Sequence, residues 1–357
     1  MTVIIAEAGV NHNGNENLAF ELVDAAYSSG ADIVKFQTFK AKNLVTENAE
    51  QADYQTINTK KKESQLAMLS RLELSYETHH KLVKHCKLLG IEFLSTAFDL
   101  ESLDFLVNDL GLQRLKLPSG ELTNAPLVLA HARTDCDIIV STGMATLAEI
   151  EMALGVIAFG YTKDPSIEPS ILAFQQAYAS EEGQKKLREK VTILHCTSEY
   201  PAPMDEINLR TMDTLAQAFD LPAGYSDHSQ GITIPIAAAA RGAVLIEKHF
   251  TLDKEMEGPD HKASLDPTEL SLMVQGIRQV ELALGRQVKT PTVSEVKNKI
   301  VARKSLVASK KIMNGETFSQ DNMAIMRPGE GMSPYKYWDL LGEKASRIYE
   351  SGDLIFE

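Results

Sequence analysis

The 357-residue chain has few cysteines, no long apolar run and too few basic residues to balance its acids. Its three cysteines, Cys86, Cys136 and Cys196, lack the C-x-x-C spacing typical of zinc and redox sites, which favours reduced thiols in a cytoplasmic protein. Charged residues such as Glu149 and Arg241 interrupt the longest apolar stretches, so we expect no membrane span. The segment after Met1 resembles a strand rather than a targeting signal.

The charge balance narrows the choice of partners. Thirty-six Lys and Arg face 49 Asp and Glu, which gives a formal net charge of −13. A field of this sign repels nucleic acids and anionic membranes, so neither is expected as a partner. A small anionic substrate remains compatible with it, provided that basic side chains gather at its site.

Short β-branched stretches recur through the first 250 residues and are almost continuously apolar. They are Val3–Gly9, Asp32–Thr38, Glu92–Phe98, Arg114–Glu121, Asp137–Met144, Val191–Tyr200, Ala223–His228 and Ala243–Thr251. Such strands are typical of a parallel sheet buried on both faces. Helical periods, for example Tyr76–Leu89, lie between most of them. This α/β pattern predicts a (β/α)8 TIM barrel, with a doubly wound open sheet as the alternative.

The remaining segments suggest the domain boundaries. We expect a barrel over residues 1–285, a polar linker over 286–302 and a small β-rich domain over 303–357. One long insertion, Lys40–Glu73, follows the second strand and carries three consecutive lysines at positions 60–62. A loop of this length at the C-terminal end of a barrel is usually a lid or a substrate wall.

Nearly every predicted strand ends in polar residues, and in a barrel these ends meet at one mouth. The candidate site residues there are Glu7, Lys35, Gln37, Thr96, Lys116, Ser119, Gly120, Glu121, Ser141, Ser198, Tyr200, Ser226, His228, His249 and Asp260. Buried lysines at such a mouth are costly unless they meet anions. By contrast, His79, His80 and His85 lie on an amphipathic helical period and are expected to face solvent.

The candidate residues suit one kind of chemistry. His228 and His249 end neighbouring strands, so their imidazoles can converge on a divalent metal, although each could instead only hydrogen-bond locally. Lys35 and Lys116, with several hydroxyls, suit a phosphate and a carboxylate. Carboxylates such as Glu121 suit sugar hydroxyls and proton transfer. Together they indicate a metal-assisted condensation of a phosphorylated enol with a polyhydroxylated aldehyde.

In order along the chain, several segments resemble the signatures of the sialic acid synthase family, which includes legionaminic acid synthases. They are Ile5–Gly14, Val34–Thr38, Lys116–Glu121, Ser141–Met144, His195–Pro201, Ser226–His228, Glu247–Thr251 and Gly258–Asp260. The tail, with Arg327-Pro328-Gly329, resembles the antifreeze-like (SAF) domain of those enzymes. The resemblance covers nearly the whole chain.

The resemblance implies condensation of phosphoenolpyruvate with an N-acetylmannosamine-type sugar to a nine-carbon 2-keto acid and phosphate. It implies manganese, or alternatively Mg2+ or Co2+, on His228 and His249. The residues implied to hold phosphoenolpyruvate are Lys35, Thr96, Lys116, Ser119, Ser141 and Ser226, and those implied to meet the sugar are Gln37, Glu121, Tyr200 and Asp260. Gly120 and Ser198 complete the expected binding set. In a domain-swapped homodimer, Arg327 would reach the N-acetyl group bound by the partner subunit.

Within this set, the expected catalytic residues are Glu121, Glu7 and Lys116. Glu121 would guide the water or the aldehyde proton, and Glu7 would orient Lys35 or a water. Ser198-Glu199 replaces the Asn-Ile of some sialic acid synthases, and Ser198–Pro203 is at least as similar to legionaminic acid synthases, whose sugar is a 2,4-diacetamido-6-deoxy hexose. This departure leaves the sugar open.

Two other classes of protein remain as alternatives. A metal-dependent barrel hydrolase would use His228 and His249 but would not need two buried lysines. A carbohydrate-binding protein built on an inactive barrel would show gaps among the polar strand ends, and the sequence shows none.

Overall fold

A computed structural model describes residues 1–51, 53–59 and 62–356, so Lys60 and Lys61 of the basic run lie outside the described residues. The chain divides into two compact units, Met1–Gly285 and Arg286–Glu357. Each unit is described separately below. No helix in the described part of the chain is long and apolar enough to cross a membrane. All three cysteines are buried and free of disulfides.

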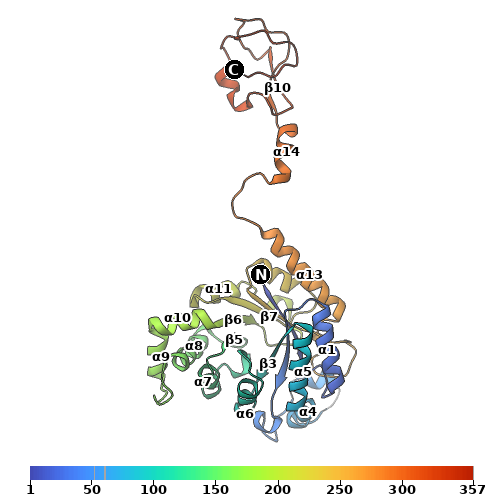
Figure 1. The fold of residues 1–357 in the computed structure, drawn as a ribbon, viewed down its shortest axis with the longest axis vertical. Coiled ribbons are helices and arrows are strands. Elements are labelled where there is room, and N and C mark those ends of the chain that lie inside the picture. Colours follow the sequence, from blue (N-terminus) through green and yellow to red (C-terminus); the bar gives the residue numbers. More distant parts are fainter. Residues whose placement is uncertain (52, 60–61, 357) are drawn as a thin grey trace. The chain divides into compact units, whose positions relative to one another are not determined.

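The first unit is a closed barrel of eight parallel strands in sequential order, surrounded by helices (Figure 1). The strands are β1 (Val3–Gly9), β2 (Ile33–Thr38), β3 (Glu92–Ala97), β4 (Arg114–Leu117), β5 (Asp137–Ser141), β6 (Val191–Cys196), β7 (Ala223–Asp227) and β8 (Leu245–His249). Because β8 pairs with β1, the sheet has no open edge. The predicted TIM barrel is therefore confirmed, and the open doubly wound sheet is excluded.

The helices of the barrel unit follow the expected alternation. They are α1 (Glu16–Ser28), α2 (Ala41–Leu44), α3 (Asp53–Thr59), α4 (Gln65–Leu72), α5 (Tyr76–Leu89), α6 (Leu100–Asp104), α7 (Ala125–Arg133), α8 (Leu147–Thr162), α9 (Ile171–Ala179), α10 (Glu181–Lys190), α11 (Thr211–Phe219), α12 (Thr233–Ala240) and α13 (Pro267–Leu284). Local sequence sets their starts: Asp266 and Glu269 form a capping box on α13, and Pro267 occupies its first turn.

Several strands are shorter than the sequence suggested, because the residues beyond them turn toward the barrel mouth. The fourth strand was expected to run to Glu121 but ends at Leu117. Pro118 follows and has no N–H to continue the sheet, and the next residues form a single 3-10 turn. The polar residues at 119–121 thus lie on a loop above the strand, where they face the mouth.

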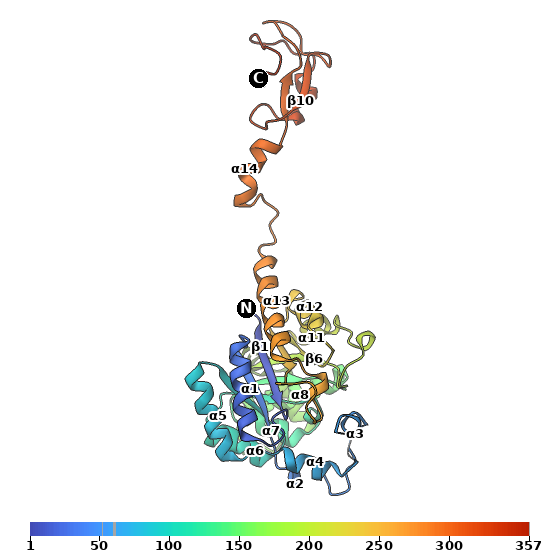
Figure 2. The same ribbon diagram turned by 90° about the vertical axis from the view of Figure 1, so that its right-hand side faces the viewer.

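The insertion after β2 folds into the helices α2, α3 and α4. Figure 2 shows them grouped at the barrel end toward which β1 points, which is the C-terminal mouth. The side chains of Met68 and Leu72 on α4 pack with Val10 and Phe39 of the barrel in one apolar cluster. The insertion is therefore anchored on the mouth.

The second unit contains α14 (Val293–Ala302), β9 (Ser305–Ala308), β10 (Met323–Met326) and α15 (Tyr337–Leu340). Strands β9 and β10 pair antiparallel, and a separate small core includes Leu306, Phe318 and Tyr349. This β-rich unit fits the antifreeze-like domain expected for the tail. Part of the expected linker is the helix α14, which a capping box at Thr292 starts.

Candidate active site

A cavity of about 420 Å³ opens at the C-terminal mouth of the barrel. All fifteen candidate residues from the barrel line it: Glu7, Lys35, Gln37, Thr96, Lys116, Ser119, Gly120, Glu121, Ser141, Ser198, Tyr200, Ser226, His228, His249 and Asp260. Convergence follows from the parallel sheet, in which every strand ends on the same side. The sixteenth candidate, Arg327, belongs to the second unit, where its Nε donates a hydrogen bond to the carbonyl of Ala302.

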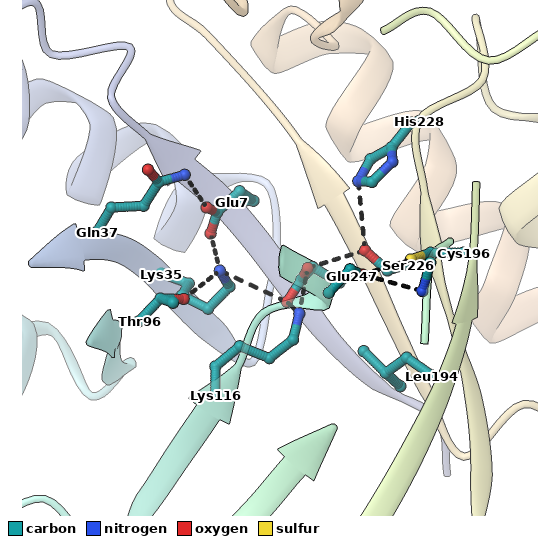
Figure 3. Close-up of polar contacts among 12 residues, drawn as sticks. Glu7, Lys35, Gln37, Thr96, Lys116, Leu194, Cys196, Ser226, His228 and Glu247 are labelled. Carbon is teal, nitrogen blue, oxygen red and sulfur yellow. Dashed lines mark hydrogen bonds and ion pairs between the residues drawn. The ribbon is translucent and has the colours of Figure 1, made fainter. Parts of the chain in front are cut away.

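The floor of the cavity is a buried network of two lysines and two glutamates (Figure 3). Lys35 Nζ lies 2.7 Å from Glu7 Oε2 and 3.6 Å from Glu247 Oε2, and it donates to Thr96 Oγ1 at 3.1 Å. Lys116 Nζ donates to both oxygens of Glu247 at 2.7 and 2.8 Å. The lysines therefore meet anions already within the protein.

Burial and ion pairing give the carboxyl groups of Glu7 and Glu247 different protonation states. Burial raises the pKa of Glu7 to about 7, although the ammonium of Lys35 opposes this shift. Burial would also raise the pKa of Glu247, but the ammonium groups of Lys116 and Lys35 outweigh it and hold that pKa well below its usual range. Glu247 is thus a fixed negative charge, whereas Glu7 can change its charge near neutral pH.

Glu247 is the site residue that the sequence analysis missed. It is the first residue of the Glu247–Thr251 segment and was given no role there, but the two-residue period of a strand places it on the same face as His249. Glu247 and His249 line the cavity, as do Ser226 and His228 on the neighbouring strand end, whereas Lys248 does not. When a strand residue that faces the cavity is of a type that binds metals, the residue two positions before it faces the cavity as well and is a further candidate.

The ring of His228 is fixed with one nitrogen directed at the cavity floor. Its Nδ1 donates to the carbonyl of Thr197 at 2.6 Å, which leaves Nε2 unprotonated in the neutral ring. Ser226 Oγ is 3.5 Å from that Nε2 but donates its single proton to Glu247 Oε1 at 2.9 Å. Burial lowers the pKa of His228 to about 4, so its ring is neutral at pH 7.

His249 lies beside His228, with ring centroids 5.6 Å apart. Its Nδ1 is buried and has no hydrogen-bond partner among the described residues, and the Asp260 carboxylate is 3.9 Å away. Burial lowers the pKa of His249 well below its usual value and raises that of Asp260 to about 6. Tyr200 covers the pair, with its ring centroid 4.1 Å from that of His228.

These features fit a divalent metal with open coordination positions. Two neutral imidazoles with available lone pairs lie side by side, and a buried nitrogen without a partner is costly unless something binds it. No group of three or more His, Cys, Asp or Glu side chains suited to a metal occurs among the described residues, so the closed four-ligand type of structural site is not indicated there.

Small residues line the rest of the floor. Ser119 Oγ accepts a hydrogen bond from the Gly143 backbone N–H at 3.0 Å, and Ser141 Oγ is buried with no hydrogen-bond partner among the residues that the structure describes. A Cβ at Gly143 would lie 2.2 Å from Ser198 Oγ, so only glycine fits there. The buried hydroxyl of Ser141 is available to a ligand oxygen.

Buried polar residues outside the cavity support the strand ends. On the outer face of β7 and β8, Lys248 Nζ lies 2.6 Å from Asp227 Oδ2 and also donates to the carbonyl of Ser229. His195 on β6 is a buried strand residue, and its Nε2 donates to the Ile207 carbonyl at 2.7 Å. The expectation for His79 was wrong, because its ring is buried and bonded to Thr38 Oγ1 at 2.8 Å.

Comparison with known proteins gives one consistent result. The sequence model of the NeuB family matches residues 22–289. N,N'-diacetyllegionaminic acid synthase from Campylobacter jejuni is 49% identical over 356 residues, which covers 100% of this chain and 99% of the relative. The enzyme of the same name from Legionella pneumophila is 43% identical, covering 98% and 92%. The crystal structure of an N-acetylneuraminic acid synthetase from Leptospira borgpetersenii in complex with citrate matches with a TM-score of 0.66 and 30% identity, covering 84% of this chain and 90% of that one.

Proposed function

Because the chain belongs to the NeuB family, we propose that it condenses phosphoenolpyruvate with an N-acetylated sugar aldehyde and releases phosphate. The relatives from Campylobacter jejuni and Legionella pneumophila are both named N,N'-diacetyllegionaminic acid synthase, so we propose this nine-carbon 2-keto acid as the product and 2,4-diacetamido-2,4,6-trideoxymannose as the sugar. The sequence analysis held this as its alternative, and the comparisons favour it over N-acetylmannosamine. The observation that carries the proposal is the buried network of Lys35, Lys116 and Glu247 beneath an open cavity.

Phosphoenolpyruvate would bind on the floor. Lys35 and Lys116 provide ammonium groups for its phosphate and carboxylate, and Thr96, Ser119, Ser141 and Ser226 provide hydroxyls. Glu7 orients Lys35 through their 2.7 Å contact, and Glu247 does the same for Lys116. Because these carboxylates neutralise much of the charge of the lysines, the floor has little net positive charge to attract the trianionic phosphoenolpyruvate. A nearby divalent cation would supply the missing positive charge.

His228 and His249 are the residues that would hold this cation, for which we propose manganese. When bound, it would act as a Lewis acid toward the aldehyde oxygen. Gln37, Gly120, Glu121, Ser198, Tyr200 and Asp260 surround the space where the sugar would lie.

In the reaction, C3 of the enol forms a bond to the aldehyde carbon, and the aldehyde oxygen takes up a proton. Water then adds to C2, and the resulting tetrahedral intermediate loses phosphate. Glu121, at the cavity wall and held by Asn124 at 2.7 Å, is our candidate for guiding the water or the aldehyde proton. Asp260, whose pKa is about 6, is placed to bond a sugar hydroxyl.

We propose further that two chains form a homodimer in which the second unit of each serves the barrel of the other. Arg327 is exposed in that unit, and its guanidinium suits a carbonyl acceptor such as an N-acetyl group. Two aromatic side chains of the same unit, Tyr335 and Trp338, are 91% and 75% exposed. Aromatic residues are enriched at protein–protein interfaces, so their exposure favours contact with another protein surface.

Phosphate release tests the proposal against the hydrolase alternative. With phosphoenolpyruvate and manganese, we expect phosphate release only when a sugar is added, faster with the diacetamido sugar than with N-acetylmannosamine, and none from the His228→Ala variant. A chelator should abolish the activity, and manganese should restore it. Phosphate release that does not depend on any sugar would instead support a hydrolase.

A further inference from the structure

We propose that the insertion after β2 forms an apolar wall which selects the sugar by its methyl-bearing substituents. The wall consists of Leu44, Val45, Met68, Leu69 and Leu72, all of which line the cavity. This inference rests on the proposed condensation and adds the property by which the sugar is chosen. Acetamido methyls and a deoxy carbon would be favoured over free hydroxyls at the same ring positions.

The wall is well anchored on the barrel. Met68 and Leu72 are buried and pack with Val10 and Phe39. Leu44 and Leu69 are half-buried at the edge of the same cluster and also line the cavity. The apolar surface that faces the cavity is therefore continuous with a packed core and does not depend on a loose loop.

Contacts of the insertion place the wall on the sugar side of the cavity. Asn58 donates to the carbonyl of Pro259 at 2.7 Å, directly before Asp260, which we assign to the sugar. A Cβ at Gly14 would lie 2.2 Å from the carbonyl oxygen of Arg71, so the end of α4 lies against the loop after β1. The lysines of the anion floor are held by Glu7 and Glu247 instead.

Such a wall distinguishes methyl groups from hydroxyls by hydration. A methyl group leaves water when it contacts leucine, whereas a hydroxyl loses its hydrogen bonds to water and gains no partner from the five apolar side chains of the wall. The insertion also contributes Gln55 and Gln65 to the cavity lining, so the selection applies to substituents that meet the apolar side chains. Among the described residues that line the cavity, Lys35 and Lys116 are the only lysines or arginines, and both are already paired with carboxylates. An acidic or phosphorylated substituent directed at the wall would therefore also be unfavourable.

Two variants test the wall with a matched control. Leu69→Asn places an amide of similar size on it, and Val45→Thr exchanges one methyl group for a hydroxyl. Leu66→Asn is the control, because Leu66 is a half-buried leucine of the same helix that does not line the cavity. The readout is the ratio of kcat/KM for 2,4-diacetamido-2,4,6-trideoxymannose to that for N-acetylmannosamine, with melting temperatures to verify folding.

We expect the wild type to prefer the diacetamido sugar. The ratio should fall about tenfold in Leu69→Asn, the usual effect of losing one apolar contact in a specificity pocket. It should fall in the same direction in Val45→Thr, and KM for phosphoenolpyruvate should change little in either. Leu66→Asn should keep the wild-type ratio.

A wild-type preference for N-acetylmannosamine would overturn the inference, as would equal ratios in all three variants and the wild type, or an equal fall in Leu66→Asn. These results would leave the condensation itself intact. If the wild type releases no phosphate with either sugar, the proposed function fails first and the inference fails with it.

Discussion

Glu247 lies at the centre of the ion network: it accepts both short contacts from Lys116 and one from Ser226, and Lys35 is within ion-pair distance. It keeps two ammonium groups charged in a buried place without any ligand. The network is thus both a structural element and a preformed anion site. Substitutions should separate these two roles, because the lysines differ in their partners.

We expect Lys116→Met to destabilise the fold more than Lys35→Met. Losing Lys116 leaves Glu247 as a buried charge whose one remaining ion pair in the described network is the 3.6 Å contact to Lys35, beside the hydrogen bond from Ser226, and such a loss costs about 3–5 kcal/mol. Losing Lys35 costs less, because Glu7, with a pKa of about 7, can become neutral. Urea unfolding measures the difference, with exposed Lys185→Met as the control.

Both lysine variants should also bind phosphoenolpyruvate about tenfold more weakly or worse, the effect of one lost charge-assisted contact. KM for the sugar should change much less. A larger effect on the sugar would show that the two subsites are assigned in reverse.

A second expectation at this scale concerns pH and Glu7. Below its pKa of about 7 the Glu7 carboxyl is neutral, and above it the carboxylate opposes an anionic ligand. The substrate phosphate, with a second pKa of about 6, is already fully ionised there. KM for phosphoenolpyruvate should therefore rise between pH 7 and 8, by up to about fivefold, because half of Glu7 is already ionised at pH 7. In Glu7→Gln the KM should be flat over this range, and an unchanged rise would assign the titration to another group.

At the residue level, the sequence predicted the set that lines the mouth and suggested that Glu7 meets Lys35, but it gave no partner for Lys116. Which lysine meets which glutamate depends on register, and β1 places Glu7 opposite both Lys35 and His249. His79 was misplaced for a related reason: the helical period indicates a buried face, but a histidine on it is buried only if it finds partners such as Thr38.

At the scale of elements, β7 and β8 carry the two histidines inward and an ion pair outward. Asp227, the last residue of β7, and Lys248 in β8 immediately precede His228 and His249 in the chain, and Asp227 Oδ1 also accepts from the Ser229 backbone N–H at 3.0 Å. The pair therefore fixes the chain on both sides of His228. Asp227 and Lys248 would therefore position the metal-binding histidines without touching the metal themselves.

We expect Lys248→Met to weaken manganese binding by about 10- to 100-fold, as is usual when the support of a ligand is lost. A direct titration with manganese, followed by calorimetry or by the signal of free Mn2+ in electron paramagnetic resonance, measures this without turnover. KM for phosphoenolpyruvate at saturating metal should change little. Manganese affinity equal to that of the Lys185→Met control would contradict the positioning role.

Element types followed from the sequence more readily than element ends. The start of α13 at Pro267 can be read from the sequence, because its cap and its proline are local signals. The sixth strand, expected over Val191–Tyr200, ends at Cys196, since the pairing that ends a strand depends on its neighbours. The fold of the insertion was not predicted either, because α2, α3 and α4 depend on packing against the mouth.

At the scale of the whole molecule, the question is why a complete barrel carries a second unit. The barrel holds fifteen of the sixteen candidate residues at its own mouth, and only Arg327 lies elsewhere. The sequence could indicate a separate small domain from the change in composition. It could not indicate which chain that domain serves, because this depends on the contacts between units.

Subunit mixing tests the proposed exchange. Arg327→Ala and His228→Ala chains, each inactive or nearly so alone, are combined under conditions that allow exchange. If the second unit acts on the partner barrel, one site of each heterodimer carries both defects and the other carries neither, so activity should return. Heterodimers that form without restoring activity would show that Arg327 acts within its own chain.

The most direct test of the central claim is the identity of the product. The protein is incubated with manganese, 13C-labelled phosphoenolpyruvate and 2,4-diacetamido-2,4,6-trideoxymannose, and the products are identified by mass spectrometry. We predict one nine-carbon 2-keto acid that contains all three labelled carbons, with one phosphate released for each sugar consumed. Labelled pyruvate and phosphate beside unchanged sugar would contradict the account.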